Sequence, residues 1–227
     1  RSRVFSVEPL AQRIDAGRLA DAIATELGRF GSVAMLRGDE ASEPYPALLA
    51  RAERDHDAVL LLGGADDAWS AFARRQADRA LFVADPETTI DGRVRGRDLV
   101  LLGPLAPGVT ERWLVEAEPA AHHLVFPVDY DAGARRIARR LAGRALGVVL
   151  SGGGARGFAH IGALAALRDA GYDVDRIGGC SMGAFVGAMA AMGWDGSQMR
   201  DRCHDELVRR RPFNDWTVPR VALIRSR

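Results

Sequence analysis

The first 130 residues alternate short apolar runs with stretches in which apolar residues recur at helical spacing. Leu19, Ile23 and Leu27 recur every four residues, and Asp15 precedes them as a candidate helix N-cap. The run 58–62 is continuously apolar and closes on a pair of glycines, which is typical of a strand buried on both faces. Similar short runs that we interpret as strands occupy residues 4–7, 32–36, 80–84 and 99–102. Strands alternating with helices predict a Rossmann-like α/β domain with a parallel sheet over residues 1–130.

This predicted sheet carries no recognisable phosphate-binding loop. Ligands of parallel α/β sheets bind at the carboxyl ends of the strands. Here the first strand leads into Glu8, Pro9 and Leu10, without a glycine, so we expect no nucleotide site in this half. His122 and His123 are adjacent on a predicted strand and point to opposite faces, so we expect no metal site from them.

Residues 131–145 predict an arginine-rich helix that connects two domains. Its apolar face contains Ala134, Ile137, Ala138 and Leu141. One interpretation is that its basic face contacts phospholipid headgroups or an acidic partner. The other, which we favour, is a solvated helix face near a domain junction. The basic residues of this segment are Arg135, Arg136, Arg139, Arg140 and Arg144.

A glycine-rich loop follows the next apolar run, residues 148–150, and leads into another predicted helix. Such a loop points backbone N–H groups at one spot beside the positive end of the helix dipole, and therefore binds a phosphate or an oxyanion. Gly152, Gly154 and Gly157 also match the G-x-G-x-x-G pattern of dinucleotide sites. That alternative needs an acidic residue at the end of the following strand, whereas Asp173 and Asp175 precede that strand.

The strand predicted at residues 175–178 runs into a G-x-S-x-G sequence, and a helix of small and apolar residues follows at 184–192. In a nucleophile elbow, a serine occupies a tight strand-to-helix turn, and flanking glycines avoid clashes with the neighbouring backbone. This pattern predicts Ser181 as a nucleophile, with Gly179 and Gly183 as the elbow glycines. The alternative is a helix start that Ser181 simply caps.

The glycine-rich loop and the elbow together resemble the patatin-like phospholipase family, most of all its bacterial and neuropathy-target-esterase-type lysophospholipases. The resemblance covers residues 147–227, and the segment 213–220 also looks like that branch. It implies the first part of a patatin-like α/β domain over residues 146–227, a phospholipid or lysophospholipid substrate, and no cofactor. It further implies a Ser–Asp dyad with Ser181 as nucleophile. The resemblance places the oxyanion hole and its support in the loop residues Gly152, Gly153, Gly154 and Arg156.

The dyad aspartate is the departure from this family pattern. The family carries it in an Asp-Gly pair far downstream of the serine, whereas this sequence ends at Arg227. Asp91 lies upstream, and Asp195 is better interpreted as a helix cap. We therefore expect this chain to be an inactive fragment of a serine esterase. A triad with His160 or His204 is disfavoured, and Cys180, beside the serine, is expected to be buried.

Composition narrows the alternatives. The 31 basic residues, all arginines, nearly balance 30 acidic residues, and a net charge of +1 argues against nucleic-acid binding. The absence of lysine excludes a P-loop lysine and any lysine-assisted serine mechanism. Two cysteines favour a reducing compartment, so we expect a cytoplasmic protein with peripheral membrane contact. All arginines other than Arg156 are expected to lie at the surface. An interaction module and a nucleotide binder that uses the glycine-rich loop remain the alternative functions.

Overall fold

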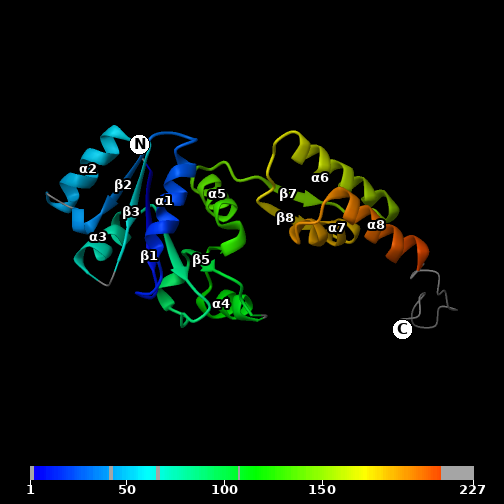
Figure 1. The fold of residues 1–227 in the computed structure, drawn as a ribbon, viewed down its shortest axis with the longest axis horizontal. Coiled ribbons are helices and arrows are strands. Elements are labelled where there is room, and N and C mark those ends of the chain that lie inside the picture. Colours follow the sequence, from blue (N-terminus) through cyan, green and yellow to red (C-terminus); the bar gives the residue numbers. More distant parts are fainter. Residues whose placement is uncertain (1–2, 41–42, 65–66, 107, 211–227) are drawn as a thin grey trace. The chain divides into compact units, whose positions relative to one another are not determined.

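The computed structural model describes residues 3–40, 43–64, 67–106 and 108–210. It divides the chain into two compact units, Arg1–Arg144 and Ala145–Arg227 (Figure 1). The segment 213–220, which carries part of the family resemblance, lies outside the described residues.

The first unit contains a six-stranded sheet in the order β2-β3-β1-β4-β5-β6, in which every described strand pair is parallel. The predicted parallel α/β architecture is therefore confirmed. The strands are β1 (Arg3–Pro9), β2 (Val33–Arg37), β3 (Ala58–Leu62), β4 (Arg79–Ala84), β5 (Asp98–Leu102) and β6 (Ala121–Val125).

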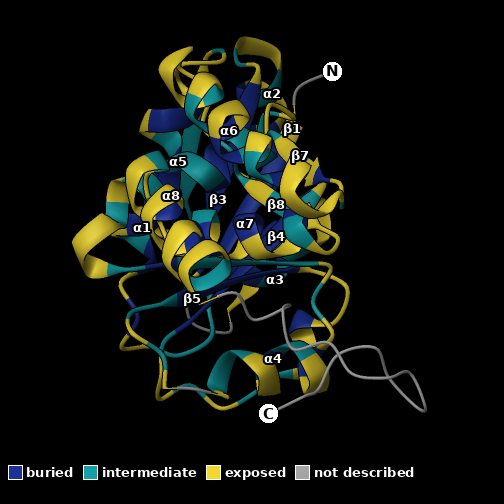
Figure 2. Cartoon of the chain, turned by 90° about the vertical axis from the view of Figure 1, so that its right-hand side faces the viewer, coloured by how far each residue is buried: buried dark blue, intermediate teal, exposed yellow. Residues whose placement is uncertain are grey.

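Helices cover both faces of this sheet. Successive strand residues point to opposite faces and therefore pack in different cores. In β4, Leu81 and Val83 pack in the same core as α1 and α5, whereas Phe82 and Ala84 pack with η2 and α4. The inner strands β1, β3, β4 and β5 are mostly buried, which Figure 2 colours dark blue, whereas the edge strands β2 and β6 are mostly half-buried. The helices are α1 (Ala16–Leu27), α2 (Tyr45–Asp55), α3 (Ala68–Gln76), α4 (Val109–Ala117) and α5 (Tyr130–Leu141), with short 3-10 turns η1 (Gly38–Glu40), η2 (Gly92–Val94) and η3 (Pro127–Asp129).

The arginine-rich segment 131–145 forms most of α5, and this helix packs on α1 as part of the first unit. Its arginines meet acidic residues that are distant in sequence. Arg135 lies 3.6 Å from Glu26, and Arg140 donates from Nε to Asp98 at 3.0 Å. The expectation that all arginines except Arg156 lie at the surface is therefore wrong, because the Arg140 side chain is only 27% exposed.

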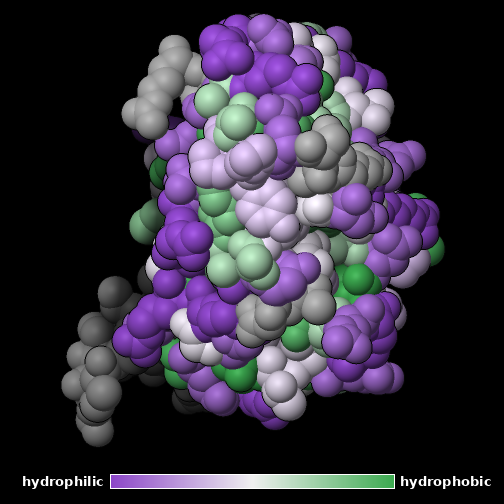
Figure 3. All heavy atoms as spheres, turned by 90° about the vertical axis from the view of Figure 1, so that its left-hand side faces the viewer, coloured by the Kyte–Doolittle hydropathy of each residue, from purple (hydrophilic) through white to green (hydrophobic). Residues whose placement is uncertain are grey.

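The second unit has a two-stranded parallel sheet and a small core of its own. Strands β7 (Gly147–Leu150) and β8 (Arg176–Gly179) are joined by η4 (Gly154–Phe158) and α6 (Ala159–Asp169), and are followed by α7 (Met182–Ala191), α8 (Gly196–Cys203) and the π-helical turn η5 (His204–Arg209). Val149 in β7 is 86% exposed, so the described unit leaves apolar strand surface uncovered. Figure 3 instead faces the first unit, where hydrophilic side chains surround smaller hydrophobic areas.

Candidate active site

Ser181 occupies a strained backbone conformation at the turn between β8 and α7. Its φ is 52° and its ψ is −123°, and among the described residues the only other non-glycine with positive φ is Glu118. Such a conformation costs about 1–3 kcal/mol and persists only where the surrounding structure imposes it. A serine held this way at the start of a helix has the backbone geometry of a nucleophile elbow.

The two glycines that flank Ser181 are required by close backbone contacts. A Cβ on Gly183 would lie 2.3 Å from the carbonyl oxygen of Leu150, and one on Gly179 would lie 2.5 Å from the carbonyl carbon of Gly183. Backbone atoms cannot yield as the end of a flexible side chain does. The G-x-S-x-G spacing therefore follows from the tight packing of β8, α7 and the end of β7.

The glycine-rich loop lies directly beside the serine. A Cβ on Gly152 would approach the Cβ of Ser181 to 3.3 Å, and one on Gly157 would meet Met182 at 2.3 Å. Gly153 and Gly154 have φ values of 146° and 54°, which favour glycine. In the described part of the chain, the N–H groups of these two glycines have no backbone acceptor. The loop thus brings two available donors to the neighbourhood of the hydroxyl.

Arg156 contributes to the shape of this loop through its backbone. Its N–H donates to the carbonyl oxygen of Gly153 at 3.1 Å, while its side chain is exposed. His160 Nε2 lies 2.8 Å from the carbonyl oxygen of Ser151, so this histidine is bonded to the start of the loop. His204 is exposed and lies 3.8 Å from Asp205. Neither histidine is bonded to Ser181, whose hydroxyl has no side-chain partner in the described chain.

Both aspartates of the Asp-Gly pairs have structural roles. Asp195 caps α8 in a capping box, in which its carboxylate accepts from the N–H of Gln198 at 2.9 Å, as expected. Asp91 caps η2 and pairs with Arg93 at 2.8 Å in the first unit.

The two cysteines differ in exposure. Cys180 is exposed, so the expectation that it is buried is wrong, because in the described chain β8 pairs only with β7 and nothing covers the residue after it. Cys203 lies in the core of the second unit, where burial raises the pKa of its thiol.

A dinucleotide site is not supported by the geometry of the second unit. The residue that ends β8 is Gly179, which offers no carboxylate for a ribose hydroxyl. Asp175 instead accepts a hydrogen bond from the N–H of Leu146 at 3.0 Å, just before β7 begins. The acidic side chain therefore lies at the opposite end of the strands from the glycine-rich loop.

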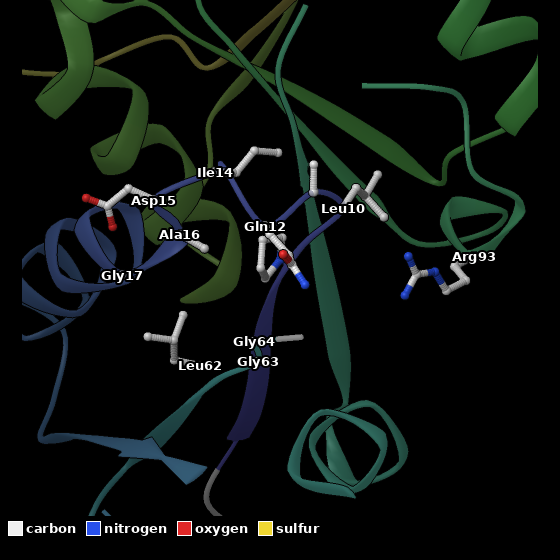
Figure 4. A pocket seen from close by; sticks show the side chains of 12 residues that line it. Leu10, Gln12, Ile14, Asp15, Ala16, Gly17, Leu62, Gly63, Gly64 and Arg93 are labelled. Carbon is white, nitrogen blue, oxygen red and sulfur yellow. The ribbon is translucent and has the colours of Figure 1, made fainter. Parts of the chain in front are cut away.

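The first unit has a cavity of about 380 Å³ at the carboxyl ends of β1 and β3 (Figure 4). The start of α1 lines it, and the Asp15 carboxylate accepts from the N–H of Arg18 at 3.0 Å, which confirms the predicted cap. A fixed negative charge at the helix start disfavours an anionic ligand there. Gly63 and Gly64 line the other side.

Comparison with known proteins shows what this chain is similar to. Residues 148–226 match the family described as patatin-like phospholipase. The relatives point to one branch of that family. An uncharacterized NTE family protein of Mycobacterium tuberculosis is 35% identical over 93% of this chain and 38% of its own length. A lysophospholipase nte1 of Aspergillus fumigatus is 57% identical over 47% of this chain and 7% of its own length. The chain is thus similar to NTE-type proteins, and it spans 38% of the mycobacterial relative.

A solved structure gives a weaker comparison. A chain of the MinC:MinD cell division protein complex of Aquifex aeolicus superposes with a TM-score of 0.41 at 14% identity, covering 63% of this chain and 95% of that chain. This likeness carries no functional argument.

Two further properties of the described residues concern membranes and metals. None of their helices is both long enough and apolar enough to cross a membrane. No group of three or more His, Cys, Asp or Glu side chains in the described ranges is arranged to hold a metal ion.

Proposed function

We propose that this chain carries the nucleophile and the oxyanion hole of a serine lipid acyl hydrolase. The observation that carries the proposal is the strained backbone of Ser181, with φ 52° at a strand-to-helix turn, packed against the glycine-rich loop. The match of residues 148–226 to the patatin-like phospholipase family supports this chemistry. The relatives named as lysophospholipases support a phospholipid or lysophospholipid as substrate.

In the proposed reaction, Ser181 Oγ attacks the carbonyl carbon of an ester and forms a tetrahedral intermediate. The N–H groups of Gly153 and Gly154 stabilise its oxyanion, and a donor of this kind lowers the barrier by about 2.7–4 kcal/mol. The amide of Arg156 holds the loop through Gly153. Collapse of the intermediate releases the alcohol and leaves an acyl-enzyme, which water hydrolyses to the free fatty acid.

This reaction needs a base to accept the serine proton, and the described residues bring none to Ser181. The family resemblance assigns that role to an aspartate in an Asp-Gly pair, but Asp91 and Asp195 cap η2 and α8. We therefore propose that the 227-residue chain by itself holds the nucleophile in place without turning over substrate.

The test is hydrolysis of lysophosphatidylcholine and of p-nitrophenyl esters by the complete gene product, by its Ser181→Ala variant and by the 227-residue chain. We expect release of fatty acid by the complete gene product that disappears in Ser181→Ala. We expect none from the 227-residue chain. Equal activity with and without Ser181 would overturn the assignment of the nucleophile. Ser181-dependent turnover by the 227-residue chain would overturn only the proposal that this chain lacks the catalytic base.

A further inference from the structure

Six arginines surround a cavity of about 1050 Å³ in the first unit, far in sequence from Ser181. The cavity lies at the amino ends of the sheet strands, because Arg79 is the first residue of β4 and Asp98 the first of β5. This is the edge opposite to the one where parallel α/β sheets commonly bind ligands. The six are Arg74, Arg75, Arg79, Arg93, Arg97 and Arg140.

The lining is positive, although the chain is nearly neutral. It contains six arginines and two aspartates, Asp78 and Asp98. Arg93 also pairs with Asp91, and Arg74 lies 3.5 Å from Glu8, so an excess of two positive charges remains around the cavity. The whole chain has a net charge of only +1. The Asp78 carboxylate also accepts a hydrogen bond from the N–H of Val4 at 2.9 Å. Charge of one sign concentrated in a concave surface raises the local concentration of ligands of the opposite sign.

Asp98 fixes part of this lining in place. It is 2% exposed, and it accepts from Arg140 Nε at 3.0 Å and from Arg79 Nη1 at 3.3 Å. Those two guanidinium groups, with His123 Nε2 at 3.6 Å from the carboxylate, hold the pKa of Asp98 well below its usual range despite its burial. The carboxylate therefore stays ionised and keeps both arginines oriented before any ligand arrives, which lowers the entropy that binding costs.

Arg75 and Arg97 complete the lining in a different way. Both side chains are exposed, and among the described residues neither pairs with a carboxylate. An unpaired guanidinium presents a planar fork of donors that matches the oxygens of a phosphate group. The cavity thus combines two arginines fixed by Asp98 with two that have no partner of their own.

We propose that this cavity binds a ligand that carries more than one phosphate group, either a phosphorylated lipid headgroup or a soluble polyphosphate. Arginines come to the cavity from α3, β4, η2 and α5, so a single small anion reaches only part of the set. A ligand with several phosphates satisfies arginines from more than one element at once. The site belongs to the first unit and is independent of the chemistry proposed for Ser181.

The test compares two double variants of equal charge. Arg75→Ala with Arg97→Ala removes the two unpaired arginines of the cavity. Arg54→Ala with Arg168→Ala removes two exposed arginines that do not line it. Binding is measured by calorimetry with inorganic tripolyphosphate and by co-sedimentation with phosphatidylcholine vesicles, with and without a phosphoinositide bisphosphate. Circular dichroism confirms that each variant is folded.

We expect the unmodified chain to bind at least one probe, and the cavity variant to bind at least about tenfold more weakly, which is about 1.4 kcal/mol. The control variant and Ser181→Ala should bind as the unmodified chain does, and salt should weaken binding. Binding of tripolyphosphate identifies a soluble ligand, and binding only to phosphoinositide vesicles identifies a headgroup. Absence of binding to both probes, or an equal loss in the control variant, overturns the proposal.

Discussion

The elbow glycines allow a sharp test. The structure contains one glycine at which a methyl group would clash with the backbone and, as a matched control, one at which it would meet nothing. In Gly183→Ala the new methyl group would lie 2.3 Å from the carbonyl oxygen of Leu150 and 2.5 Å from that of Ser151. Both distances fall well short of ordinary van der Waals contact, which begins at 3.4 Å. The backbone of α7 or of β7 must therefore move to admit the methyl group.

The cost follows from this geometry. Adding one carbon to a packed interior costs about 1–3 kcal/mol, and the upper end applies when the obstacle is backbone. We expect Gly183→Ala to lower the local stability of the second unit by about 3 kcal/mol, or roughly a hundredfold in the opening equilibrium. A methyl group on Gly162 in α6 would meet nothing within 4 Å, so Gly162→Ala should raise stability by about 0.5–1 kcal/mol.

Hydrogen exchange followed by mass spectrometry measures both effects on peptides from residues 147–194, without interference from the first unit. Exchange in these peptides should be roughly a hundredfold faster in Gly183→Ala and slower in Gly162→Ala. If the two variants exchange at the same rate, the close packing of α7 on β7 is refuted, and with it the reason for the elbow glycines.

Three other variants test separate parts of the structure. Ser181→Gly should make the second unit about 1 kcal/mol more stable than Ser181→Ala does, because glycine accepts φ 52° without strain; equal exchange rates for the two would contradict the strain. Asp195→Ala should cost about 1 kcal/mol through loss of the α8 capping box, seen as faster exchange in α8 and not in α6. Asp98→Asn should lower the free energy of unfolding by about 1.5–3 kcal/mol at pH 7, because it leaves the partly exposed Arg79 and Arg140 without their buried partner. The pKa of Asp98 is lowered in the folded chain, so its contribution to stability is complete above its ordinary pKa of 3.8 and is lost as pH falls from there through the folded pKa. Urea titrations should therefore show the stabilities of the variant and of the unmodified chain converging in acid. A difference that stays constant with pH would contradict the ion pairs.

Local sequence patterns predict the strands, helix caps and turns of this fold, because these features depend on residues close together in the chain. The continuous apolar run 58–62 is a central strand, since burial on both faces selects apolar residues at every position. Asp15 and Asp195 cap helices as expected, because a cap depends on residues two or three positions away. The turn at Ser181 lies where the G-x-S-x-G spacing predicts it, between β8 and α7.

What sequence patterns missed depends on contacts between distant residues. Arg140 and Asp98 are 42 positions apart, and no helical or strand periodicity relates them. The apolar face of α5 indicated a helix, but its packing on α1 was not visible in the sequence. Cys180, beside the serine, is predicted to be a small buried hydrophobe, yet its exposure depends on which elements lie across from it. Asp98, which directly precedes the apolar run 99–102 in a chain rich in arginine, is a signal that could have pointed to the cavity.

The central proposal is that Ser181 is a nucleophile, with the N–H groups of Gly153 and Gly154 as the donors that stabilise the oxyanion. Covalent labelling tests it most directly: the complete gene product is incubated with a long-chain alkyl fluorophosphonate, and the adduct is located by peptide mass spectrometry. We predict a single phosphonyl group on Ser181, which is absent in Ser181→Ala and present in a Cys180→Ala control. A label on another residue, or equal labelling of the Ser181→Ala variant, would contradict the assignment of the nucleophile.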